Sequence, residues 1–311
     1  MVLQTGHRQI IEKAMNILVG TAGFSYKDWV GTVYPADLKS RKIPPLQYLA
    51  LFYDLVEINT SFYGPLRPST AKQWCAWVKE VNPQFLFTCK LYKVFTHSPL
   101  ATVESTSAST LRFTAEDEKL TREGLNSLAN EGKLGAVLAQ FPISFRNTDE
   151  NRSYVQKLIA MFGRDYPLAI EIRHSSWNEP AVLREFSSLG VGFVNIDQPL
   201  LGKALRGTRH VTGPLGYVRL HGRNYQQWFA SSKVEDRYNF LYTPEQLESW
   251  KERIEEIGEQ AERTFVVTNN HYLGKAAANA TELKSMLTGK KVKAPRELVK
   301  TYPDLAAFAV A

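Results

Sequence analysis

The chain has 311 residues, of which 22% are charged and 44% hydrophobic, and its formal net charge is +7. These fractions are typical of a globular protein and exclude a disordered or fibrous chain. No apolar run approaches the ~20 residues of a membrane helix, and the first fifteen residues lack the apolar centre of a signal peptide. Two cysteines, Cys75 and Cys89, make no disulfide framework, so we expect a cytoplasmic protein that does not enter a membrane.

Eight short apolar runs with β-branched residues recur along the chain and predict eight strands. They cover residues 17–21, 55–59, 85–90, 136–141, 168–173, 191–197, 217–221 and 265–269. Most segments between them show the periodicity of a helix, and the predicted helices cover 45–53, 70–81, 116–130, 154–162, 180–189 and 275–287. One further helix is predicted to begin after Thr243, because Thr243 and Gln246 form a capping box around Pro244. The helical pattern of residues 201–210 is weaker than that of the other segments.

This alternation predicts the α/β class, with a (β/α)8 barrel of the TIM type as the architecture. A doubly wound open sheet is the alternative. The barrel is favoured because polar residues end nearly every strand, and an open sheet needs them only at its switch point. No linker-like composition divides the chain, so we expect one barrel domain over residues 16–311, after an N-terminal extension of residues 1–15.

Alternation along the strands predicts which side chains point into the barrel. Val56 and Ile58 suit the helix layer, so Glu57 and Asn59 point inward. Extended to the other strands, this pattern predicts two layers of inward side chains. The deeper layer holds Glu57, Glu171 and Arg219. The upper layer holds Asn59, Lys90, Gln140, Arg173, Asp197, His221 and Asn269, and Asn195 is predicted to point inward as well. The deeper charges must pair, and they either stabilise the barrel or orient the upper layer.

The upper layer collects donors that suit an anionic, hydroxyl-rich ligand, because arginine binds phosphate or carboxylate through parallel hydrogen bonds. TIM barrels often hold phosphate after strands seven and eight. The corresponding candidate substrate-binding residues here are Arg219, Arg223, Asn270, His271, Gly274 and Lys275, the last two at a helix N-terminus. Tyr63 and Trp177 follow strand ends, where aromatic rings either floor a site or close the barrel top.

A metal site is a weaker hypothesis. Histidines 97, 174, 221 and 271 accompany Glu57, Glu171 and Asp197, but no HxH or HExxH spacing occurs. The neighbouring cations Lys90, Arg173 and Arg219 disfavour an ion, so we expect no metal and no cofactor. Nucleophile, P-loop and dinucleotide motifs are also missing.

Seven motifs together resemble those of the YecE-like family, a domain of unknown function, number 72. They are GTAGFSY at 20–26, VEINTSFY at 56–63, FTCK at 87–90, LAQFP at 138–142, EIRH at 171–174, RLHGR at 219–223 and NNHYLGK at 269–275. The resemblance runs from about residue 17 to 288. The family more often has two prolines where Phe141-Pro142 stands, which affects only a loop. The resemblance implies a TIM-type barrel and supplies no activity.

Two functions fit these residues. The first is an enzyme, such as an isomerase, lyase or hydrolase, acting on a phosphorylated or acidic sugar-like molecule. His221 would be its general acid or base, and Glu57, Glu171 and Asp197 the carboxylates of the catalytic set. The alternative is a nucleic-acid binding protein or a metal-assisted nuclease or phosphodiesterase. It rests on the net charge, the basic run from Lys284 to Lys300 and the loop 222–242, where cations mix with aromatic residues. A barrel that binds a metabolite without chemistry also fits.

Overall fold

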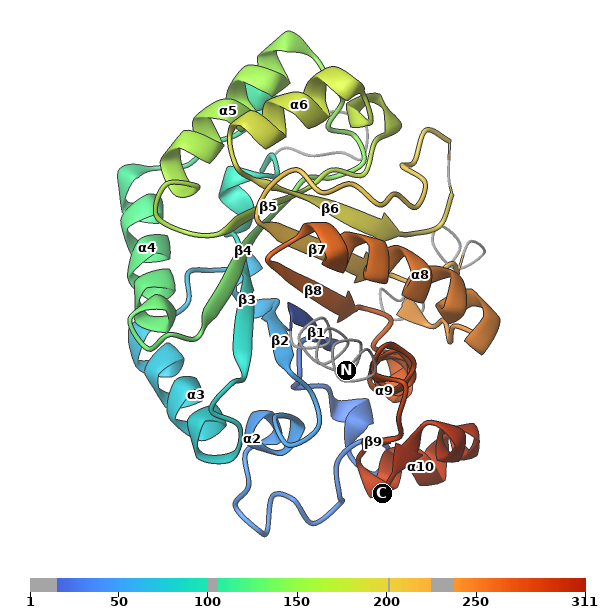
Figure 1. Cartoon of the computed structure of the whole chain (residues 1–311). Helices are drawn as coiled ribbons and strands as arrows, with labels where there is room; N and C mark the ends of the chain where they lie inside the picture. The colour runs from blue at the N-terminus through green and yellow to red at the C-terminus, as the bar shows by residue number, and fades with distance from the viewer. Residues whose placement is uncertain (1–15, 100–105, 201, 225–237) are drawn as a thin grey trace, which may run out of the picture.

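The computed structural model describes residues 16–99, 106–200, 202–224 and 238–311, and within them eight parallel strands close into a barrel (Figure 1). The strands are β1 (Ile17–Ala22), β2 (Leu55–Ile58), β3 (Leu86–Lys90), β4 (Leu134–Gln140), β5 (Leu168–Glu171), β6 (Gly192–Asp197), β7 (Leu215–Leu220) and β8 (Arg263–Thr268). Each strand pairs with the next, and β8 returns to β1 with Thr268 opposite Thr21. The closed pairing confirms the TIM-type barrel and excludes the open sheet.

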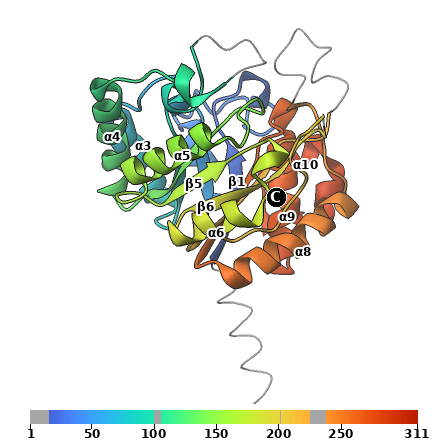
Figure 2. The same ribbon diagram turned by 90° about the horizontal axis from the view of Figure 1, so that it is seen from above.

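Helices surround the strands (Figures 1 and 2). They are α2 (Pro45–Leu49), α3 (Pro68–Val81), α4 (Ala115–Ala129), α5 (Asp149–Phe162), α6 (Pro180–Ser188), α8 (Pro244–Gln260) and α9 (Lys275–Thr288). In Figure 2, α3, α4 and α5 lie along one side of the barrel, and α8 and α9 lie along the other. The periodicity of the sequence therefore located these helices correctly, with bounds that differ by a few residues. The weak stretch near 201–210 forms no helix within its described part, residues 202–210.

Capping fixes where α8 begins. The Thr243 hydroxyl accepts a hydrogen bond from the backbone N–H of Gln246, and the Gln246 side chain accepts one from the backbone of Thr243. Pro244 occupies the first turn, where its missing N–H has no cost. The predicted capping box is confirmed. A similar box at Thr114 and Asp117 starts α4.

Small side chains let α9 lie close to the barrel. Its buried face carries Ala276, Ala277 and Ala280. The Thr268 hydroxyl of β8 donates to the carbonyl of Ala276 at 2.9 Å, and the Tyr53 hydroxyl donates to that of Ala277 at 2.9 Å. The first residues of α9 are thus held next to the end of β8, at the carboxyl end of the barrel.

The chain after α9 adds a small unit against it. A short parallel pair, β9 (Val292–Lys293) and β10 (Ala309–Val310), encloses α10 (Arg296–Thr301) and the 3₁₀ helix η8 (Pro303–Ala307). The Tyr302 hydroxyl ties this unit back to the carbonyl of Leu273 at 2.7 Å. Within the described residues, no helix is long and apolar enough to cross a membrane.

The strand β6 departs from the predicted alternation. Phe193 packs against Phe186 of α6, and the Asn195 side chain bonds to Thr208 and His210 in the connection between β6 and β7. The inward placement of Asn195 predicted from the sequence is therefore wrong. The physical reason is that this connection is not helical, so its backbone polar groups need partners, and an outward-facing asparagine supplies them.

Candidate functional site

A buried ion cluster fills the barrel below its carboxyl end. The Arg219 guanidinium bonds to Glu57 through Nη2 at 2.6 Å and to Glu171 through Nη1. All three side chains are at most 1% exposed. The Tyr217 hydroxyl donates to Glu57 at 2.9 Å, and it lies 2.8 Å from the Thr88 hydroxyl. The sequence correctly placed Glu57, Glu171 and Arg219 together, and all three lie buried in the barrel interior.

Above this layer, Arg173 connects the buried charges to the barrel mouth. Its Nε donates to Glu171 Oε1 at 2.7 Å, and its side chain is 13% exposed. Its Nη2 lies 3.3 Å from His221 Nε2, and His221 Nδ1 lies 2.9 Å from the Asn269 amide nitrogen. Glu171 therefore accepts from Nε of the guanidinium, and the His221 ring lies beside Nη2. An arginine held in this way binds an anion with little loss of side-chain freedom.

The environment of His221 changes its expected role. Burial, with the guanidinium of Arg173 beside the ring, lowers its pKa from 6.5 to about 3. The ring is 0% exposed and stays neutral at physiological pH. The hypothesis of a His221 acid or base rested on an ordinary pKa near neutrality. The neutral ring lies beside both Arg173 and Glu171, with Nε2 3.4 Å from Glu171 Oε1.

The pKa of Lys90 lies near neutrality. Burial and the neighbouring Arg219 lower its pKa from 10.5 to about 7. Its Nζ donates to Gln140 Oε1 at 2.7 Å and lies 4.2 Å from the centroid of the Phe62 ring. Within the described residues it has no ion pair with a carboxylate. We call Lys90, Gln140, Arg173, His221 and Asn269 the upper cluster.

Three rings at the carboxyl end of the barrel, those of Tyr26, Phe62 and His97, were not among the catalytic or substrate-binding residues predicted from the sequence, and His97 was considered there only as a metal ligand. The Tyr26 ring stacks on His271 with centroids 4.3 Å apart, and its hydroxyl donates to the carbonyl of Ala22 at 2.6 Å. His97 meets the edge of Phe62, and burial with nearby Lys90 lowers its pKa to about 4. All three follow the ends of β1, β2 or β3, so their positions after predicted strands were the available signal.

Other predicted residues lie apart from the upper cluster. Asp197 bonds to Arg223 Nε at 2.8 Å, on the outward-facing side of β6. Asn270 is fully buried and donates to the carbonyl of Phe240 and to Asn279. Trp177 is 1% exposed, with its indole N–H bonded to the carbonyl of Phe145. These contacts give Asn270 and Trp177 packing roles.

The predicted phosphate loop after β8 is shaped by contacts within the protein. Gly274 has φ +80°, and a side chain there would meet Val33 at 2.7 Å. Lys275 bonds to the side chain of Asn239. His271 lies between Tyr26 and Tyr238, and burial lowers its pKa to about 4.

Tyr63, by contrast, is 73% exposed. Lys233, Arg237, Tyr225 and Trp228 of the basic loop lie outside the described residues.

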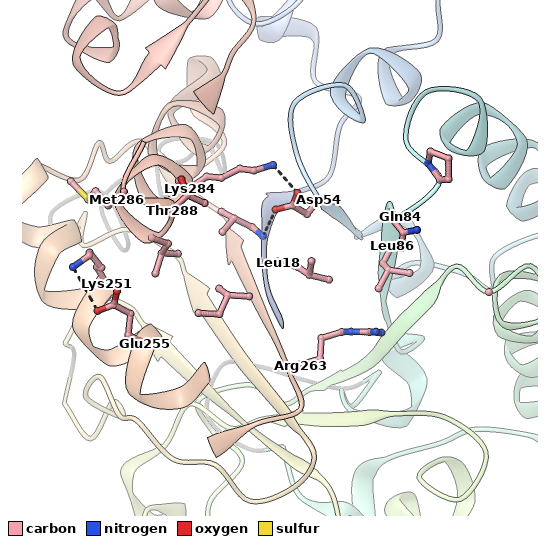
Figure 3. Close-up of a pocket in the computed structure, with 16 residues that line it drawn as sticks. Leu18, Asp54, Gln84, Leu86, Lys251, Glu255, Arg263, Lys284, Met286 and Thr288 are labelled. Carbon is pink, nitrogen blue, oxygen red and sulfur yellow. Dashed lines mark hydrogen bonds and ion pairs between the residues drawn. The ribbon is translucent and has the colours of Figure 1, made fainter. Parts of the chain in front are cut away.

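A cavity of about 810 Å³ lies at the opposite end of the barrel (Figure 3). Leu18 and Leu86, at the starts of β1 and β3, line it together with Met286 of α9. Charged pairs also lie along it, such as Lys284 with Asp54 at 2.7 Å. None of the predicted site residues lines this cavity. Active sites of TIM-barrel enzymes lie at the carboxyl end, so the candidate functional site considered for this chain is the carboxyl end.

Potential metal ligands do not gather among the described residues. No group of three or more His, Cys, Asp or Glu side chains there could hold an ion. Cys75 and Cys89 are both buried free thiols, and burial raises the pKa of each.

The fold and the polar carboxyl end define a TIM-type barrel protein. Residues 18–302 match the model of a protein family of unknown function, DUF72, and the chain belongs to this family. It is 30% identical to the UPF0759 protein YunF of Bacillus subtilis (strain 168) over 283 residues, covering 87% of this chain and 94% of that protein.

Two solved structures of DUF72 family proteins are similar to this chain. The protein from Thermotoga maritima MSB8 is 32% identical, with a TM-score of 0.73, over 87% of this chain and 98% of that one. The protein from Enterococcus faecalis V583 is 26% identical, with a TM-score of 0.71, over 90% of this chain and 98% of that one. These similarities support the barrel and the family, and they name no ligand.

Proposed function

We propose that this protein is an enzyme that binds an anionic, hydroxyl-rich small molecule, such as a phosphorylated or acidic sugar, at the carboxyl end of its barrel. The charge balance of the cluster carries the proposal. Two carboxylates, Glu57 and Glu171, neutralise two guanidiniums, those of Arg173 and Arg219. Lys90 is then the unbalanced group, and its protonated form leaves the site with one positive charge that an anion can neutralise.

Arg173 is the anchor of the proposed anion. Its Nε and Nη2 are occupied by Glu171 and His221, and its Nη1 has no partner among the described residues. The amides of Asn59 and Gln140 offer hydrogen bonds for hydroxyl groups. Active sites of TIM barrels lie at this end, which supports the placement without defining the reaction.

Lys90 replaces His221 as the proposed acid–base group. A pKa of about 7 provides both the amine and the ammonium at physiological pH, as general acid–base catalysis requires. Binding an anion favours the ammonium and therefore takes up a proton. An isomerase or a lyase needs only these groups, and they are the reaction classes we favour.

Sulfate is a suitable probe because its charge is constant between pH 6 and 9. Calorimetry at low salt should show sulfate binding to the wild type that weakens at least tenfold in Arg173→Gln, about 1.4 kcal/mol. The matched control is Arg263→Gln, at the opposite end of the barrel. Affinity should also fall as the pH rises through 7, and Lys90→Met should remove this dependence. Equal sulfate affinity in the wild type and Arg173→Gln would show that the proposal is wrong.

A further inference from the structure

The position of Lys90 supports a more specific role than proton transfer. Resting on the proposed function, we propose that the substrate carries an aldehyde or ketone group and that Lys90 forms a Schiff base with its carbonyl carbon. The substrate class is thus a carbonyl compound with an anionic group, and the covalent bond is made at Nζ of Lys90.

The first argument is the partner of the amine. Lys90 ends β3 at the barrel mouth, and its Nζ bonds to the side-chain oxygen of Gln140 at 2.7 Å. An amide oxygen accepts a hydrogen bond from an amine as well as from an ammonium, whereas a carboxylate favours the ammonium. The Gln140 contact therefore orients the nitrogen without fixing it in its charged, non-nucleophilic form.

The second argument is the set of charges that face Lys90. Glu57 comes from β2, Glu171 and Arg173 from β5 and its end, Arg219 from β7, and His97 from the loop after β3. Both carboxylates are already bonded to guanidiniums. His97 is neutral near pH 7, because burial lowers its pKa to about 4. A lysine desolvated beside other cations is the activated form of this nucleophile.

The third argument is the balance of the reaction. The lone pair of the neutral Lys90 amine attacks the carbonyl carbon, and the π electrons of the C=O bond move to oxygen. A proton passes from nitrogen to this oxygen through solvent, giving a carbinolamine. A second proton from solvent lets the oxygen leave as water while the C=N bond forms. The resulting iminium is positive at a site where Glu57 and Glu171 lie nearby, and it withdraws electrons from the adjacent carbon, as an isomerase or lyase requires.

Reductive trapping tests this bond directly. The full-length protein is incubated at pH 7 with dihydroxyacetone phosphate and sodium cyanoborohydride, which reduces an iminium to a stable secondary amine. Peptide mass spectrometry then measures the adduct at every lysine. We expect the occupancy at Lys90 to be at least tenfold above that at exposed Lys93, three residues further along the chain. The adduct should disappear in Lys90→Met and persist in the matched control Lys93→Met.

The outcomes distinguish failure of the Schiff base from failure of the anion site. Equal labelling of Lys90 and Lys93, or preferential labelling of Lys275, overturns the Schiff base, and the wild-type map alone decides this if Lys90→Met fails to fold. Dihydroxyacetone without its phosphate tests the anion site separately. Labelling of Lys90 that is stronger with the phosphorylated ketone, and loses this preference in Arg173→Gln, supports both proposals. Equal labelling of Lys90 by the ketone with and without its phosphate supports the Schiff base and contradicts the anion site.

Discussion

The buried guanidinium of Arg219 allows a quantitative test of how the barrel interior is stabilised. In Arg219→Met, Glu171 keeps its ion pair with Arg173, but within the described residues Glu57 keeps only the hydrogen bond from the Tyr217 hydroxyl. Removing one partner of a buried pair costs about 3–5 kcal/mol, because a charge is left in a medium that solvates it poorly. An unfolding entropy of about 2.1 cal/mol/K per residue gives roughly 1.5 °C for each kcal/mol in a chain of 311 residues, so the melting temperature should fall by about 5–8 °C.

Thermal unfolding followed by circular dichroism measures this loss, and two further variants show its origin. Arg219→Met combined with Glu57→Gln should recover most of the stability, because the amide still accepts from Tyr217 and no buried charge is left without a partner. Arg209→Met breaks an exposed pair with Glu256, with side chains 64% and 45% exposed, and should cost at most about 1 kcal/mol. If Arg219→Met costs no more than Arg209→Met, or if Glu57→Gln gives no recovery, the reasoning about buried charge is refuted.

Two predictions follow from the pKa values of the upper cluster. Because the pKa of folded Lys90 is about 7 and its ordinary value is 10.5, the unfolded chain binds an extra proton between these values. Stability should therefore rise with pH across that window by up to about 1.4 kcal/mol per pH unit relative to Lys90→Met, measured by urea denaturation. A parallel pH profile of the two proteins would contradict this. The ring of His221, whose pKa is about 3, should keep the nitrogen chemical shifts of a neutral imidazole from pH 8 to 5 in NMR spectra. A midpoint near 6.5 would instead restore the hypothesis of a His221 acid or base.

The lowered pKa of Lys90 changes which residue we propose as the acid–base group of the candidate site. The sequence pointed to His221 because an isolated imidazole titrates near neutrality. In the folded chain, the same burial and cationic neighbours that lower the pKa of His221 to about 3 bring that of Lys90 to about 7. Desolvation disfavours the charged form of both groups, so the residue with the higher ordinary pKa becomes the one that titrates at physiological pH.

Local patterns in the sequence predicted most of the fold. The apolar runs located the eight strands, and the capping box at Thr243 located the start of α8. Alternation along β2, β5 and β7 placed Glu57, Glu171 and Arg219 in one layer, and their hydrogen bonds join them there. These features were predictable because strand period, helix period and capping depend on residues that are near one another in the sequence.

Only the tertiary structure decided which residues belong to the upper cluster. Asn195 has a polar neighbour on the outer side of β6, so it faces away from the barrel. Asn270 and Trp177 are bonded to backbone carbonyls from distant parts of the chain. His97 and Phe62 approach Lys90 through loops whose paths depend on packing. The desolvation, the hydrogen-bond partners and the pKa of each side chain depend on groups brought together from different strands. The local sequence pattern therefore determined the barrel, and the three-dimensional contacts determined the chemistry of its candidate site.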